Sequence, residues 1–381
     1  MKINELPTPC YVIDEKKLRK NLEILKKVKD DTGCKILLAQ KAFSNFFEYP
    51  LIGQYLDGTT ASGLFEAKLG YEKMGKENHV FAPAFKESEI GEITDICEHL
   101  VFNSFSQLEK YADFCKEKGV SIGIRVNPEC STQGEHAIYD PCAPGSRMGT
   151  TREQWDLALE KDPALAELLD GLHFHTLCEQ NADDLAKTLE AVEEKFGSYL
   201  YKMKWLNFGG GHHITRADYD IGLLEKCILH MKEKYDLDIY LEPGEAIALN
   251  AGYLAATVMD VVDNDIHTLI LDASAACHMP DVLEMPYRPP LCSSGMPEEK
   301  KYTYRLSSYT CLAGDIIGDY SFDEEKKVDD RLYFEDMAIY SMVKNNTFNG
   351  IPLPDIAVMD ESGECKVIRR FSYDDFKGRL S

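Results

Sequence analysis

The chain has no apolar run long enough to span a bilayer, and its first residues, MKINELPTPCYVID, lack the features of a secretory signal. None of its 12 cysteines forms a CxxC pair, so no zinc cluster is indicated. Basic residues are scarce: 42 lysines and arginines face 65 acidic residues, a net charge of −23. That charge disfavours nucleic acid and favours small cations. We expect a cytoplasmic protein with reduced thiols and no membrane partner.

Short apolar runs alternate with amphipathic segments over the first two thirds of the chain. We interpret eight runs as strands, at 35–42, 58–62, 79–84, 100–104, 121–127, 171–176, 204–209 and 238–244. Intervening segments such as 106–119 and 181–197 carry apolar residues at helical spacing. Eight such units over roughly 250 residues predict an α/β fold, a parallel (β/α)8 TIM-type barrel, rather than a doubly wound open sheet.

After about residue 250 the pattern changes. The segments TVMDVVD, TLILDAS, YTYRLSS, RLYFED and AIYSM are β-rich and no longer alternate with long helices, which predicts a mainly antiparallel β-domain. We expect the barrel to cover residues 14–250 and the β-domain to cover 251–381 together with 1–13. Residues 127–149 are predicted to form a long loop after the fifth barrel strand, and such loops are usually functional.

Active-site groups of such barrels lie at the C-terminal ends of the strands. Lys41 ends the first strand, where a desolvated amine has a lowered pKa and can form an imine, although a surface lysine is the alternative. Glu242 ends the eighth strand and is expected to point into the mouth of the barrel. Arg125 ends the fifth strand and offers either a fixed cation for a ligand or a structural ion pair.

Two further motifs complete this set. His173 and His175 alternate in GLHFHT, so both rings face one side of the strand and suit either a metal or a flat ligand. Taken alone, the pair is more simply read as one core histidine and one hydrogen-bonded histidine. Gly209, Gly210 and Gly211 follow the seventh strand, where barrels often bind phosphate, and no nucleotide motif is present. An amine, a ring partner, an anion cradle and a carboxylate are what pyridoxal phosphate requires, and no metal is needed.

The order of the motifs resembles that of the barrel-type pyridoxal-phosphate decarboxylases, which include the ornithine, diaminopimelate and carboxynorspermidine decarboxylases. The matching pieces are LLAQKAF, ASGLFEA, GLHFH, NFGGGHH, LEPG, YTCLAGD and AIYSMVKNNTFNG. The pieces PTPCYVID, LHFHTLCEQ, HMPDVLEMPYRP and FNGIPLP are most similar to the carboxynorspermidine/carboxyspermidine decarboxylases. The resemblance covers nearly the whole chain.

The resemblance implies a homodimer with shared active sites and assigns roles to particular residues. Lys41 and Cys311 would be catalytic, with Cys311 supplied across the dimer. The cofactor would be held by Lys41, Arg125, His175, Gly209, Gly210, Gly211, Glu242 and Tyr340. The substrate, an α-amino acid extended by two amines, would meet Glu245, Asp281, His278 and Asp315.

Two departures from the wider family bear on the substrate. Ornithine- and diaminopimelate-type enzymes carry an arginine after EPG, whereas Glu245 reverses the local charge here and suits a cationic substrate. Their phosphate-binding glycine–serine pair is replaced by Leu177 and Cys178, so another group must take that contact. We therefore predict decarboxylation of carboxynorspermidine, carboxyspermidine or both. The alternatives are a diaminopimelate or ornithine decarboxylase, a noncatalytic cofactor carrier or regulator, and a metal-dependent hydrolase using His173 and His175.

Overall fold

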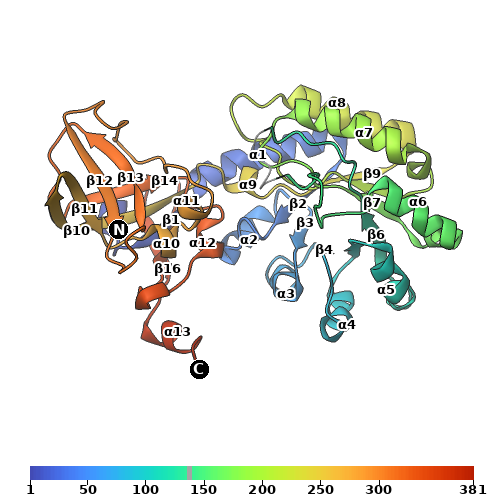
Figure 1. The fold of residues 1–381 in the computed structure, drawn as a ribbon, viewed down its shortest axis with the longest axis horizontal. Helices are drawn as coiled ribbons and strands as arrows, with labels where there is room; N and C mark the ends of the chain where they lie inside the picture. Colours follow the sequence, from blue (N-terminus) through green and yellow to red (C-terminus); the bar gives the residue numbers. More distant parts are fainter. Residues whose placement is uncertain (135–139) are drawn as a thin grey trace. The chain divides into compact units, whose positions relative to one another are not determined.

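The computed structural model describes residues 1–134 and 140–381 (Figure 1). The chain forms two compact units. One comprises Asn21–Ile247, and the other joins Met1–Lys20 to Ala248–Ser381. The sequence placed the divisions at 13/14 and 250/251. Among the described residues, no helix combines the length and the apolarity that crossing a bilayer requires.

The first unit is a closed barrel of eight parallel strands, which confirms the predicted fold class. Its strands are β2 (Lys35–Ala39), β3 (Gly58–Ala61), β4 (Glu77–Phe81), β5 (His99–Phe102), β6 (Ser121–Arg125), β7 (Gly171–His173), β8 (Trp205–Asn207) and β9 (Asp238–Leu241). Hydrogen bonds between β2 and β9 close the barrel. The strands are buried on both faces, which explains why each reads as a short continuous apolar run rather than an alternating one.

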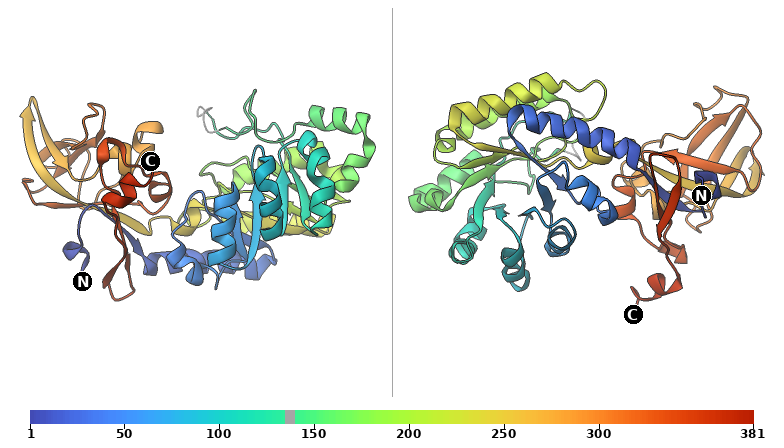
Figure 2. Two further views of the ribbon diagram at one scale, coloured as in Figure 1. Left: turned by 90° about the horizontal axis from the view of Figure 1, so that it is seen from below. Right: turned by 180° about the vertical axis from the view of Figure 1, so that it is seen from behind.

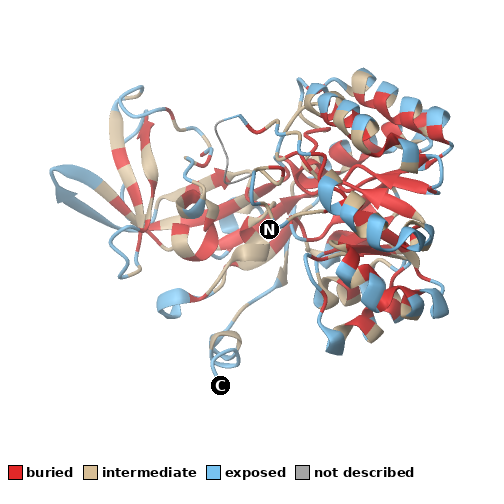
Figure 3. Cartoon of the chain, turned by 45° about the vertical axis from the view of Figure 1, so that its right-hand side comes forward, coloured by how far each residue is buried: buried red, intermediate tan, exposed pale blue. Residues whose placement is uncertain are grey.

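Helices surround the outside of these strands (Figure 2). They are α1 (Glu15–Thr32), α2 (Tyr49–Ile52), α3 (Leu64–Lys73), α4 (Glu87–Ile96), α5 (Phe105–Glu117), α6 (Arg152–Lys161), α7 (Ala182–Leu200) and α8 (Ile221–Tyr235). The short helix α9 (Glu245–Ala248) follows β9 and is buried throughout. Figure 3 shows each longer helix buried on its inner side and exposed on its outer side, as its amphipathic pattern predicts. The predicted loop 127–149 connects β6 to α6, and its residues 135–139 lie outside the described part of the chain.

The second unit is a mainly antiparallel sheet with strand order β13-β12-β11-β10-β1-β15-β16, and β14 also pairs with β10. Its strands are β1 (Cys10–Asp14), β10 (Gly252–Asn264), β11 (Ile266–Leu271), β12 (Tyr302–Ser308), β13 (Ile316–Phe322), β14 (Arg331–Glu335), β15 (Asp355–Met359) and β16 (Cys365–Arg369). Only the β1–β15 and β11–β12 pairs are parallel. The short helices are α10 (Ala275–His278), α11 (Asp281–Glu284), α12 (Ser341–Lys344) and α13 (Tyr373–Lys377).

One predicted β segment is wrong. AIYSM (338–342) forms a bend that leads into α12, and Tyr340 at the start of that helix has a positive φ of 57° that a strand does not tolerate. Strands β13, β15 and β16 were not predicted: β13 is interrupted by Gly318 and Asp319, and β15 and β16 are only five residues long. The N-terminal strand β1 pairs with β10 and β15, so the sheet unit is built from both ends of the chain.

Candidate active site

Three polar side chains come from the last residues of adjacent barrel strands. Arg125 ends β6, His173 ends β7 and Asn207 ends β8, and strand pairing sets them in register. Because in-register residues of parallel strands face the same way, their side chains form a row at the C-terminal end of the barrel. Glu242 follows β9 directly and closes this row. Strand pairing therefore brings residues from four separate sequence motifs together at one end of the barrel.

Glu242 is the best-held group of this row. Its side chain is 6% exposed, accepts a hydrogen bond from Asn207 Nδ2 at 2.8 Å, and lies 3.3 Å from His173 Nε2. Burial alone would raise the pKa of this carboxyl, but the hydrogen bond from His173, and after it the hydrogen bond from Asn207, lower the pKa to about 2. Burial lowers the pKa of His173, so a neutral ring donates Nε2–H to an ionised Glu242.

Lys41 lies two residues beyond the end of β2. Lys41 is partly accessible to solvent, but protein atoms surround its amine. The resulting desolvation, and after it the charge of Arg125, lower the pKa of Lys41. Arg125 is buried, donates from Nη2 to the His175 carbonyl at 2.8 Å, and lies 4.8 Å from the centre of the Phe81 ring. An amine with a lowered pKa is the nucleophile that carbonyl chemistry needs.

The glycine loop is packed against both neighbouring strand ends. A Cβ at Gly210 would lie 2.4 Å from the Glu242 carbonyl oxygen and 3.2 Å from His175 Cε1. A Cβ at Gly211, which has a φ of +83°, would lie 2.1 Å from the Leu177 carbonyl oxygen. Each position therefore requires glycine.

The backbone N–H groups of this loop are partly used within the barrel. Gly209 N donates to Asn207 Oδ1 at 2.8 Å, and Gly210 N donates to His175 Nδ1 at 3.2 Å. Gly211 N has no such partner within the described residues. Burial, followed by the charges of Lys41 and Arg125, holds the pKa of His175 well below its usual range, so its ring is neutral.

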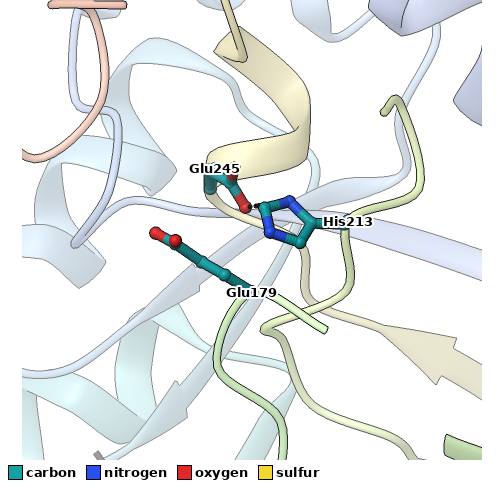
Figure 4. Close-up of side chains that lie close together, drawn as sticks. All are labelled: Glu179, His213 and Glu245. Atoms are coloured by element: carbon teal, nitrogen blue, oxygen red, sulfur yellow. Dashed lines mark ion pairs between the residues drawn. The ribbon is translucent and has the colours of Figure 1, made fainter. Parts of the chain in front are cut away.

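Glu245 begins α9 and is 7% exposed. Its Oε2 atom lies 3.0 Å from Nδ1 of His213, which is equally buried. Glu179, in the segment after β7, brings a third ligand atom within 4.8 Å of these two (Figure 4). The sequence analysis named Glu245 and missed the other two residues. Among the described residues this is the one group of three or more metal-type ligands, and it contains neither His173 nor His175.

In the sheet unit, Cys311 is exposed and lies in a turn. Its backbone N–H donates to Asn349 Oδ1 at 3.1 Å. Asp315, four residues on, is buried and accepts hydrogen bonds from four donors. They are Ser274 Oγ (2.7 Å), Ser308 Oγ (2.6 Å), Thr310 Oγ1 (2.6 Å) and Ala276 N (3.1 Å). The Asp315 carboxylate ties the turn that carries Cys311 to the segment that begins α10. The expected contact of Asp315 with substrate stays a prediction.

Other sheet-unit candidates are also engaged within that unit. His278 is fully buried, with Nδ1 accepting from Ser274 N at 3.2 Å and Nε2 3.1 Å from the Pro352 carbonyl oxygen. Burial lowers the pKa of His278 to about 4. Asp281 pairs with Lys344. Both ring nitrogens of His278 are thus used, whereas the Asp281 carboxylate already binds an ammonium group.

A family model described as "Pyridoxal-dependent decarboxylase, C-terminal sheet domain" matches residues 10–338. The chain belongs to this family of pyridoxal-dependent decarboxylases. The decarboxylase is 41% identical to the carboxynorspermidine/carboxyspermidine decarboxylase of Campylobacter jejuni, over 98% of this chain and 99% of the relative. It is 39% identical to the carboxyaminopropylagmatine decarboxylase of Synechocystis, over 100% and 97%.

Solved structures agree with these sequence relatives. The crystal structure of carboxynorspermidine decarboxylase complexed with norspermidine, from Campylobacter jejuni, superposes with a TM-score of 0.91. It is 40% identical, and the match covers 98% of this chain and 100% of that chain. The resemblance inferred from the motifs is confirmed, and the decarboxylase uses pyridoxal phosphate.

The residues of the barrel fit that cofactor. Lys41 offers an amine whose pKa is lowered, Glu242 offers an ionised buried carboxylate, and Gly211 offers an N–H without a protein partner. The sequence analysis did not name Asn207, although this residue opens the glycine motif. Its amide is buried at the end of β8, and the sequence indication was a polar residue at the end of an apolar run.

Proposed function

We propose that this decarboxylase removes the α-carboxylate of carboxynorspermidine, carboxyspermidine or both, giving the polyamine and carbon dioxide in polyamine biosynthesis. The main observation behind this proposal is the environment of Glu245. This residue is a buried carboxylate, and no lysine or arginine of the described chain forms an ion pair with it. These substrates carry two amines that are cationic at neutral pH. The name of the Campylobacter relative supports the same substrates.

When bound, pyridoxal phosphate supplies an aldehyde that takes up an amine and a ring that accepts the electron pair released with carbon dioxide. Lys41 is the proposed attachment point because its amine has a lowered pKa. Glu242 is proposed to keep the pyridine nitrogen protonated, since its own pKa of about 2 leaves it ionised at any working pH. His173 and Asn207 hold that carboxylate in one orientation.

The other cofactor contacts are proposed on the same basis. The neutral His175 ring is suited to cover the cofactor ring, because a charged imidazolium would repel a pyridinium. Gly211 N, with no partner among the described residues, is the glycine-loop donor best suited to phosphate, and Gly209 and Gly210 shape the loop around it. Arg125 and Tyr340 complete the set expected from the family motifs.

Cys311 is the proposed acid that returns a proton to the α-carbon. It is exposed and lies in a turn fixed by Asp315 and Asn349. We further propose a cytoplasmic homodimer in which Cys311 of the partner subunit serves each barrel. Asp281 is proposed to bind one substrate amine in exchange for Lys344, because a lysine side chain and a primary amine of the substrate present the same ammonium group.

A second substrate has a specific observation in its favour. The Synechocystis relative, named for carboxyaminopropylagmatine, is 39% identical over the whole chain, close to the 41% of the Campylobacter relative. Carboxyaminopropylagmatine would end in a guanidinium group rather than an ammonium. A planar guanidinium prefers a bidentate carboxylate, whereas an ammonium is satisfied by separate acceptors.

Product analysis tests the proposal. The holoenzyme is incubated with carboxynorspermidine, carboxyspermidine, carboxyaminopropylagmatine, diaminopimelate and ornithine, and both carbon dioxide and the amine product are measured. We expect the highest kcat/KM with one of the first two substrates. Faster turnover of diaminopimelate or ornithine would refute the proposal, and preference for carboxyaminopropylagmatine would select the second candidate.

A further inference from the structure

Three loops at the C-terminal end of the barrel bring Glu179, His213 and Glu245 together. Glu179 lies between β7 and α7, His213 follows the glycine loop, and Glu245 begins α9. Figure 4 shows both glutamates on the same side of the His213 ring, with Glu245 above and Glu179 below. One ligand atom from each residue lies within 4.8 Å of the other two, and His213 Nδ1 lies 3.0 Å from Glu245 Oε2.

The buried part of this group lacks hydrogen bonds. Glu245 Oε2 and His213 Nδ1 are both buried atoms that lie 3.0 Å apart, and neither has a hydrogen-bond partner. The two side chains are 7% and 6% exposed. A buried carboxylate oxygen without a donor is costly, so this site is built for a ligand that donates hydrogen bonds or carries positive charge.

We propose that Glu179 and Glu245 together bind one ammonium group of the substrate, and that His213 holds Glu245 in position. This inference rests on the proposed function, which supplies a substrate with two amines. It adds Glu179 as a specificity-determining residue and His213 as a positioning residue.

The spacing of the acceptors fits an ammonium. The ligand atoms of the three residues lie within 4.8 Å of one another, so one ammonium group that donates hydrogen bonds of about 2.8 Å can reach both carboxylates. The charge fits as well, because two carboxylates beside one imidazole favour a cation. Glu179 is exposed whereas Glu245 is buried, so an incoming amine meets one carboxylate at the surface and the other inside.

The test uses the pyridoxal-phosphate-loaded enzyme and norspermidine as the probe. Calorimetric binding and steady-state kinetics with carboxynorspermidine are compared for wild type, Glu179→Gln, Glu245→Gln and the double variant. Glu190→Gln, which removes the same charge from an exposed position of α7, is the matched control. Cofactor absorbance confirms that each variant is loaded.

We expect each single variant to weaken norspermidine binding and raise KM by about tenfold, with kcat nearly unchanged because the lost contact is made equally before and during the reaction. The fold loss of binding in the double variant should be well below the product of the two single losses, since both carboxylates share one ammonium. His213→Asn alone should weaken norspermidine binding, and the same substitution should have little further effect when combined with Glu245→Gln. Glu190→Gln should match wild type.

Unchanged binding and KM in both single variants would overturn the proposal even if wild type turns over carboxynorspermidine normally. Full additivity in the double variant would also overturn it, because the two carboxylates would then act on separate groups. One equivalent of bound divalent metal, lost in both single variants, would identify the cluster as a metal site instead. If wild type decarboxylates neither carboxy-polyamine, the proposed function fails, and the norspermidine binding series still decides the role of the two glutamates.

Discussion

The barrel and the sheet unit treat their candidate polar residues in opposite ways. In the barrel, Lys41 has a lowered pKa and Glu245 has a buried oxygen without a donor. In the sheet unit, the Asp315 carboxylate has four donors and both nitrogens of His278 are engaged. The barrel groups are thus held ready for a ligand, whereas the sheet groups hold their own fold.

This difference separates two kinds of polar motif that a sequence presents alike. A polar residue in a strand-end motif can serve chemistry or it can close a turn, and only its partners distinguish the two. Substitution should therefore affect turnover or ligand binding in the barrel and stability in the sheet unit. Cys311 and Asp281 are the exceptions in the sheet unit, because Cys311 is exposed and Asp281 is proposed to bind a substrate amine.

Lys41→Ala should have the largest effect. Without its amine the barrel loses the proposed attachment point, and carbon dioxide release should fall by about a thousandfold or more. Folding should be unaffected, because the lysine side chain has open surface. Single-turnover assays with added pyridoxal phosphate measure the effect, and activity within tenfold of wild type would contradict the assignment.

Cys311→Ala should lower kcat by about a hundredfold, the usual contribution of a positioned general acid, with KM nearly unchanged. Thermal stability should remain at the wild-type value, because the thiol is exposed. A drop in stability with normal turnover would move Cys311 to the structural group. Mixing inactive Lys41→Ala and Cys311→Ala chains should restore some activity if subunits share sites.

Glu242→Gln should lower kcat by about 10- to 100-fold, from a lost charged hydrogen bond of about 1.5–3 kcal/mol. The variant should still bind pyridoxal phosphate, since Lys41 is intact. Stopped-flow kinetics and cofactor titration separate the two quantities. Wild-type turnover in this variant would exclude Glu242 as the partner of the ring nitrogen.

The pH dependence of stability provides a control for this assignment. A carboxyl with a depressed pKa contributes stability that is complete above about pH 4.5 and is lost as the pH falls toward about 2. Acid unfolding of the cofactor-free protein should therefore be less steep across this window in Glu242→Gln than in wild type. Equal slopes would show that the carboxyl titrates normally.

Asp315→Asn should act on stability. An amide cannot accept all four hydrogen bonds, so the free energy of unfolding should fall by about 1–3 kcal/mol. Denaturant unfolding checks this value. A large rise in KM without loss of stability would return Asp315 to the substrate-contacting group expected from the sequence.

Asp281→Asn should have the smallest effect, a rise in KM of about three- to fivefold. Lys344 already balances the Asp281 charge, so binding a substrate amine exchanges one ammonium for another and gains little. Steady-state kinetics measure this change. A rise as large as that expected for Glu245→Gln would show that Lys344 does not compete.

The sequence was sufficient for the barrel and for the position of Lys41 and Glu242 just beyond strand ends, because apolar runs mark the strands. The roles of the two residues stay predictions. The sequence was insufficient for Glu179 and His213, which meet only through the paths of two loops. The role of Asp315 depends on Ser274, 41 residues away in the chain, which no local pattern shows. The bend at Tyr340 has a positive φ that its β-rich segment did not indicate.

Identifying the lysine that carries the cofactor tests the proposed active site most directly. The holoenzyme is treated with borohydride, digested, and mapped by mass spectrometry. We expect the reduced pyridoxyl group on the peptide that contains Lys41, with none on other lysines. Attachment at another lysine, or protein that remains colourless after incubation with pyridoxal phosphate, would contradict the assignment of Lys41 as the residue that carries the cofactor.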